Sequence, residues 1–200
     1  MAESYVIGVD FGSDSVRALI VNTETGENVG QGVACYPRWK AGLYQHPEYS
    51  IFRQHPLDYL ESLEKCITTA LAELTEEQKD HVIGIGVDTT GSTPVPVDKN
   101  GTPLALLDEF AENENAMFFL WKDHAAAAEA DEINKLFRNN SENDYTKYQG
   151  DYSAEWYWAK ILYAVRHDEA IRQAAYTWEE HCDWMTGILC GETRPEKIYH

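Results

Sequence analysis

The feature that most constrains the fold is a near repeat of six residues. The segment Ile7-Gly-Val-Asp10-Phe-Gly12 is matched further along by Ile85-Gly-Val-Asp88-Thr-Thr90. In each copy, small and β-branched residues predict a buried strand that ends on an aspartate. Ligands of α/β sheets bind at the carboxyl ends of parallel strands. If these two strands are neighbours, Asp10 and Asp88 meet at one edge of the sheet.

The remaining pattern predicts a mixed α/β fold. Alternating strand-like and helical periods favour a meander of three strands, a helix that begins at Pro56, and then a fourth strand. A helix between the third and fourth strands indicates a crossover to a parallel strand beside the meander. Residues 36–55 have neither period and are interpreted as an ordered loop rich in aromatic residues. The predicted strands cover 5–11, 15–22, 28–35, 82–88 and 93–97; the later helices cover 115–130, 131–138, 153–166, 169–175 and 180–190, with Gly191 as a cap.

Composition excludes several classes of function. The 200 residues include 16 basic and 34 acidic side chains, a net charge of −18. Such acidity argues against nucleic acids and anionic membranes as partners. No segment approaches the roughly 20 apolar residues of a membrane span. Four cysteines without a CxxC pair, and a start that lacks a signal-like pattern, predict free thiols in the cytoplasm.

The first copy of the repeat has the chemistry of a phosphate site. Asp10-Phe-Gly-Ser-Asp-Ser15 joins a strand to a strand, which excludes a Walker loop and a Rossmann fingerprint. A tight Gly/Ser hairpin turns backbone N–H groups outward as an anion-binding nest. A carboxylate beside that nest can hold Mg²⁺ through its waters. The alternative is an ordinary polar hairpin in which Asp10 and Asp14 make turn hydrogen bonds.

The same residues carry a resemblance to a known family. Asp10-Phe-Gly-Ser-Asp-Ser-Val-Arg17 resembles the first phosphate motif of the FGGY carbohydrate kinases, which have the RNase H-like fold of actin and hexokinase. The resemblance covers essentially the whole chain and is deepest for the ribulokinase branch. It implies an α/β domain with a mixed five-stranded sheet and flanking helices. The segments that carry this deeper resemblance are Tyr36–Lys40, Phe52–Tyr59, Gly150–Lys160 and Glu180–Trp184.

The resemblance also implies roles for individual residues. Asp10 would be the carboxylate on the metal and phosphate side. Many relatives have Thr at position 14, so an Asp there departs from the pattern and would repel a phosphate. On the sugar side, Gly91 matches a small residue that approaches the sugar, and Trp121 and Asp123 match a segment that flanks its hydroxyls. The residues expected around the γ-phosphate are Gly12, Ser13, Asp14 and Ser15.

The resemblance further implies an activity that this segment does not complete. An FGGY kinase of the ribulokinase branch transfers the γ-phosphate of ATP, with Mg²⁺, to the 5-hydroxyl of L-ribulose in L-arabinose catabolism. The family's sugar-binding lysine, its catalytic base and its nucleotide pocket match positions beyond residue 200. Residues 1–200 are therefore expected to be the sugar-binding N-terminal domain, inactive alone, with an apolar face that could support a homodimer. The alternatives are another FGGY kinase, for xylulose or glycerol, and a non-catalytic actin-like module for sugar binding or assembly.

Overall fold

The computed structural model describes residues 3–140, 142 and 144–198. The chain divides into two compact units, which are considered separately. Unit 1 comprises residues 1–43 and 55–90, and unit 2 comprises residues 44–54 and 91–200. None of the helices in the described ranges combines the length and apolar character needed to cross a membrane.

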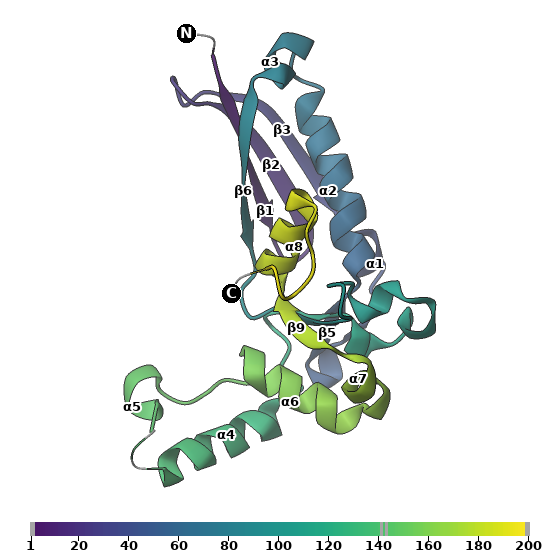
Figure 1. The fold of residues 1–200 in the computed structure, drawn as a ribbon, viewed down its shortest axis with the longest axis vertical. Helices are drawn as coiled ribbons and strands as arrows, with labels where there is room; N and C mark the ends of the chain where they lie inside the picture. Colours follow the sequence, from purple (N-terminus) through teal and green to yellow (C-terminus); the bar gives the residue numbers. More distant parts are fainter. Residues whose placement is uncertain (1–2, 141, 143, 199–200) are drawn as a thin grey trace. The chain divides into compact units, whose positions relative to one another are not determined.

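A four-stranded mixed sheet forms the centre of unit 1 (Figure 1). Its strand order is β3-β2-β1-β6, with β1 antiparallel to β2 and parallel to β6. The predicted meander and crossover are thus confirmed. The strands are β1 (Tyr5–Phe11), β2 (Ser15–Asn22), β3 (Asn28–Cys35) and β6 (Val82–Thr89).

One long helix covers one face of this sheet. Helix α2 (Pro56–Leu71) begins at a proline, as predicted, and packs on β2 and β3. Two glycines of β3 allow this close approach: a Cβ added at Gly32 would lie 2.1 Å from the carbonyl oxygen of Cys66, and one at Gly30 would lie 2.6 Å from that of Ala70. The apolar side chains beneath α2 alternate along the strands with exposed ones, as a sheet covered on one side requires. Unit 1 also contains α1 (Pro37–Lys40) and α3 (Glu76–Asp80).

The predicted five-stranded sheet is wrong in its strand count. The expected fifth strand exists as β7 (Pro94–Val97), but it pairs antiparallel with β9 (Thr177–Glu180) in a separate two-stranded sheet of unit 2. The pattern at 93–97 identified an extended segment and could not identify its partner, because β9 is distant in sequence. The fold class, mixed α/β, stands.

Unit 2 is mainly helical, with short pieces of sheet. Residues 36–55, predicted as a loop, contain α1 in unit 1 and a small sheet segment in unit 2. The short strand β5 (Ile51–Gln54) pairs with both β4 (Gln45–His46) and β8 (Phe118–Phe119). The helices are α4 (Ala127–Asn139), α5 (Thr146–Gln149), α6 (Tyr157–His167), α7 (Glu169–Ala174) and α8 (His181–Cys190).

The helix predicted over 115–130 is wrong in its first half. Residues 114–116 form a 3₁₀ turn, 118–119 form β8, and helix starts only at Ala127. Met117, Leu120 and Trp121 have the i, i+3, i+4 spacing of a helix face, yet residues 117–120 are all buried in a segment that contains β8. The later helices are close to the predicted ranges, and Gly191 ends α8 in the left-handed conformation, as expected of a glycine cap.

Candidate active-site segments

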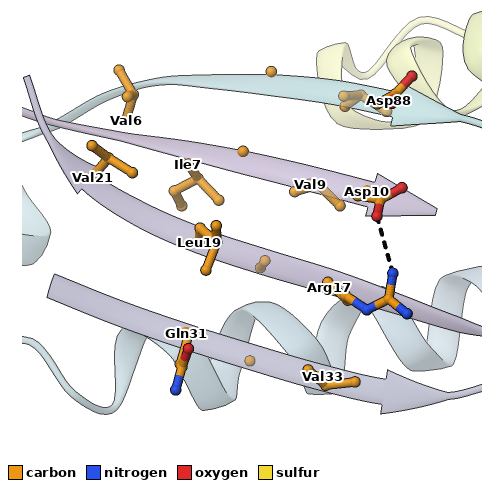
Figure 2. A pocket seen from close by; sticks show the side chains of 15 residues that line it. Val6, Ile7, Val9, Asp10, Arg17, Leu19, Val21, Gln31, Val33 and Asp88 are labelled. Atoms are coloured by element: carbon orange, nitrogen blue, oxygen red, sulfur yellow. Dashed lines mark hydrogen bonds and ion pairs between the residues drawn. The ribbon is translucent and has the colours of Figure 1, made fainter. Parts of the chain in front are cut away.

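The two aspartates of the near repeat are brought together in unit 1. Asp10 on β1 and Asp88 on β6 are direct register partners on adjacent parallel strands. Both are exposed at the carboxyl ends of their strands, on the sheet face that α2 does not cover (Figure 2). Arg17 on β2 donates to Asp10 Oδ2 across 3.2 Å. The predicted meeting of these carboxylates is confirmed.

The Gly12–Ser15 turn that follows Asp10 is a tight hairpin. The Gly12 N–H donates to the Ser15 carbonyl at 2.9 Å, and the Ser15 hydroxyl donates to Asp14 Oδ1 at 3.0 Å. A Cβ added at Gly12 would lie 3.3 Å from the Ser15 carbonyl oxygen, so a small residue suits the turn. The Asp14 carboxylate thus accepts a hydrogen bond within the hairpin, which makes it less suited to contact a phosphate. Phosphate contacts by Gly12, Ser13, Asp14 and Ser15 stay predictions.

Tyr36 holds this hairpin in place through two hydrogen bonds. Its hydroxyl donates to the Gly12 carbonyl at 3.1 Å, and its backbone N–H donates to the Asp14 carbonyl at 3.0 Å. The ring is fully buried, and burial raises the pKa of the Tyr36 hydroxyl, with smaller contributions from the charges of Asp10 and Asp14. The phenol therefore stays neutral and remains a donor. The position of Tyr36 in the sequence does not indicate this contact.

A shallow apolar groove crosses the uncovered face of the sheet and ends at the two aspartates. Its volume is about 870 Å³, and it includes Val6, Leu19 and Val33, with Asp10, Arg17 and Asp88 at one end (Figure 2). The glycines Gly8 and Gly86 form its floor, since no described atom lies within 4 Å of a Cβ added at either one. The charged end of the groove carries two carboxylates and one guanidinium, that of Arg17.

The paired carboxylates fit a magnesium ion that keeps most of its waters. Mg²⁺ is usually held by one or two carboxylates together with waters and substrate phosphates, rather than by a cage of protein ligands. Asp10 and Asp88 supply such a pair at the exposed carboxyl ends of β1 and β6. No group of three or more His, Cys, Asp or Glu side chains that could hold a metal ion occurs among residues 3–140, 142 and 144–198.

The predicted sugar-side residues lie in unit 2. Gly91 is exposed, and no described atom lies within 4 Å of a Cβ added there, so this position has space in front of it. Its neighbour Ser92 has a left-handed backbone, with φ of 51°. Such a conformation costs a residue with a side chain roughly 1 kcal/mol or more, and it is maintained by surrounding contacts.

Asp123 is buried and its carboxylate is engaged inside the protein. Oδ2 accepts hydrogen bonds from the Arg53 guanidinium and, at 2.7 Å, from the Phe52 N–H; Oδ1 accepts one from the Ala125 N–H at 3.1 Å. Arg53 also lies over the ring of Phe119, 3.5 Å from its centroid. This network anchors the 120–123 turn to β5. A direct sugar contact by Asp123 stays a prediction, and an anchoring role is the one its contacts support.

Trp121 presents its side chain from that anchored turn. The turn is closed by a hydrogen bond from the Asp123 N–H to the Leu120 carbonyl at 2.9 Å, and the Leu120 N–H donates to the Phe52 carbonyl. Trp121 keeps 41% of its surface exposed. An exposed indole on a rigid turn suits a contact with the apolar face of a sugar.

Lys160 binds two backbone carbonyls of this region. Lys160 of α6 is fully buried, although lysine is a residue type that is almost never fully buried. Its ammonium donates to the carbonyls of Ser92 and Leu120. Burial lowers the pKa of Lys160 to about 7. Helical spacing alone gave no signal of this role.

Comparisons with known proteins place the chain in a family. The profile of the FGGY family of carbohydrate kinases, N-terminal domain, matches residues 5–196. The chain is similar to the ribulokinase of Vibrio parahaemolyticus, with 52% identity over 98% of this chain and 35% of that protein. It is also similar to the ribulokinase of Mycolicibacterium smegmatis, with 38% identity over 95% of this chain and 35% of that protein.

Solved structures support the fold. The xylulose kinase of Bifidobacterium adolescentis superposes with a TM-score of 0.72 at 17% identity, over 98% of this chain and 38% of that one. The glycerol kinase of Plasmodium falciparum with ADP gives a TM-score of 0.70 at 15% identity, over 95% and 35%. The chain spans about a third of the length of the ribulokinases it matches. The profile match over residues 5–196 shows that the chain belongs to the FGGY family of carbohydrate kinases.

Proposed function

We propose that this chain is the N-terminal, sugar-binding part of an ATP-dependent L-ribulokinase. The intact enzyme transfers the γ-phosphate of ATP to the 5-hydroxyl of L-ribulose in the cytoplasm, as a step of L-arabinose catabolism. The observation that carries the proposal is 52% identity to a ribulokinase along 98% of the chain. The pairing of Asp10 with Asp88 is its independent physical support.

In this proposal, unit 1 binds the phosphate and its Mg²⁺ ion. Asp10 and Asp88 hold Mg²⁺ through its waters, and the bound ion supplies positive charge that offsets the phosphate oxygens. The Gly12–Ser15 hairpin contributes backbone N–H groups and hydroxyls beside the γ-phosphate. The Tyr36 hydroxyl holds the Gly12 carbonyl by a hydrogen bond, so the outer side of the hairpin is left for the ligand.

In the same proposal, unit 2 binds the sugar. Gly91 leaves room for the substrate, and Trp121 offers an apolar surface to it. Asp123 and Arg53 keep the turn of Trp121 in place. The family resemblance implies that the general base and the nucleotide pocket match positions beyond residue 200, and the proposal assigns them there. Residues 1–200 alone are therefore expected to show no kinase turnover.

The test is ATP turnover by the intact protein against a panel of ketopentoses, with glycerol included. A clear preference in kcat/KM for L-ribulose is expected. A preference for xylulose or glycerol would keep the family and overturn the assigned substrate. Absence of turnover with any sugar, together with sugar binding, would identify a non-catalytic module instead. Isothermal titration with L-ribulose and no nucleotide measures that sugar binding.

A further inference from the structure

Lys160 connects two segments that are far apart in sequence. Its ammonium donates to the Ser92 carbonyl at 2.5 Å and to the Leu120 carbonyl at 2.9 Å. Ser92 follows Gly91, and Leu120 precedes Trp121. The lysine therefore holds the backbone beside both residues that are proposed to contact the sugar, although its own side chain is fully buried.

Packing alone does not explain a lysine at this position. Transfer of an ammonium group from water to a protein interior is unfavourable, and a buried charge is retained where its hydrogen bonds are satisfied. An apolar residue of similar length would fill the same space in α6 without that cost. The two carbonyl hydrogen bonds are what a lysine adds.

The Ser92 loop is held from more than one side. Ser92 has a left-handed backbone, with φ of 51°, and the next N–H, that of Thr93, donates to Glu180 Oε2 at 2.8 Å. One peptide unit thus has its carbonyl bound by Lys160 and its N–H bound by Glu180. A strained backbone persists where its surroundings determine it this strongly.

Charged groups around Lys160 shape its environment. Glu180 and Glu155 favour the charged ammonium, whereas Arg53 and burial disfavour it, and burial is the largest effect. Because Glu180 also accepts from Thr93, it and Lys160 form one network around the 91–93 loop. The network belongs entirely to unit 2.

We propose that Lys160 is a positioning residue that sets the geometry of the sugar-binding segments 91–93 and 120–121. The inference rests on the proposed function, since that function makes Gly91 and Trp121 sugar contacts. Lys160 acts through backbone carbonyls and does not touch the substrate. Its loss is expected to weaken productive sugar binding while the nucleotide interaction is preserved.

The test compares K160M, K160R and K135M in the intact protein. Methionine keeps the length of the side chain and removes both donors, arginine keeps donors, and Lys135 is an exposed lysine of α4 in the same unit. K160M is expected to raise the sugar KM by roughly 10- to 100-fold, because small misplacements of binding groups are costly in rate and binding. The KM for ATP should change less than about twofold, K160R should recover part of the loss, and K135M should match the wild type.

Hydrogen exchange measured by mass spectrometry supplies a readout that needs no activity. Peptides covering 89–95 and 118–124 should exchange faster in K160M than in K135M, because both loops lose an anchor. Unchanged exchange in these peptides would overturn the anchoring, whatever the substrate. Faster exchange with an unchanged sugar KM would overturn the positioning role. Faster exchange in a protein whose wild type does not turn over L-ribulose would leave the anchoring intact and overturn the assigned function.

Discussion

Asp10 and Asp88 are register partners on adjacent parallel strands, and both carboxylates point from the same uncovered face of the sheet. Only Asp10 has a described cation beside it, Arg17 at 3.2 Å. Both ends of that ion pair are more than half exposed, so the pair contributes little to stability. In the proposed function, these two carboxylates are the ones that hold Mg²⁺ through its waters.

Replacement of Asp10 by Asn in the intact enzyme should lower kcat by about 100-fold or more. The reason is that removal of a group that organises charge at the reacting phosphate typically costs that much. The sugar KM should change only a few-fold, because the sugar-side residues are in unit 2. Steady-state kinetics at saturating Mg²⁺ measure both values. E64Q, at an exposed position of α2, is the matched control, and an equal loss of kcat in E64Q would remove the case for Asp10.

Gly32 should tolerate no side chain, whereas Gly8 should accept one. A Cβ at Gly32 would lie 2.1 Å from the Cys66 carbonyl oxygen, and one at Gly8 has no described atom within 4 Å. We expect G32A to lower the free energy of unfolding by about 2 kcal/mol or more, since helix and strand must separate. G8A should change it by less than about 1 kcal/mol. Urea unfolding of both variants decides this, and equal effects would contradict the packing described for α2.

The sequence predicted the parts of this fold that depend on local pattern. Strands 5–11, 15–22 and 28–35 have the predicted bounds, because each has a clear period and a polar turn at its end. The meeting of Asp10 and Asp88 followed from the repeat and from the helix between the third and fourth strands, which indicates a crossover to a parallel strand. Partners distant in sequence were beyond that reasoning: β7 was assigned to the wrong sheet, since nothing in 93–97 specifies a partner at 177–180.

The anchoring contacts of the site were also hidden from sequence. Lys160 is fully buried although a lysine almost never is, and Tyr36 lies in the aromatic-rich segment that was predicted to be a loop. Each is identified only by the carbonyl that it binds. Backbone carbonyls have no sequence signature, so residues that act through them are the ones sequence analysis misses.

Removal of the Asp123 carboxylate should destabilise unit 2 strongly. D123A leaves the fully buried Arg53 guanidinium without its ion-pair partner and frees two backbone N–H groups. Loss of one member of a buried ion pair typically costs about 3–5 kcal/mol. E132A, which breaks the half-exposed pair with Arg166, should cost about 1 kcal/mol or less. Thermal unfolding of the two variants tests this, and equal shifts in midpoint would refute an anchoring role for Asp123.

Glu179 should make stability fall as pH rises from about 4.5 to 7. Its side chain is buried, neither carboxylate oxygen has a hydrogen-bond partner among the described residues, and burial raises its pKa to about 7. The folded state therefore binds a proton more tightly than the unfolded state. That contribution is complete at low pH and is lost as pH rises through 7. Unfolding free energies measured from pH 4.5 to 8 should show a decline of roughly 2–3 kcal/mol that E179Q removes. An identical decline in E179Q would assign it to another group.

Residues 1–200 produced alone should self-associate through the uncovered sheet face of unit 1. Leu19 and Val33 are large apolar side chains that are 45% and 58% exposed, and they line the groove beside the floor of glycines. Contiguous apolar surface of this kind drives association in water. Light scattering should show a mass that rises with concentration. L19E should reduce that rise by placing a charge in the groove, whereas the conservative V21T, also in the groove, should have a smaller effect. A clean monomer at high concentration would show that this face does not associate, and the expected homodimer would then require a different surface.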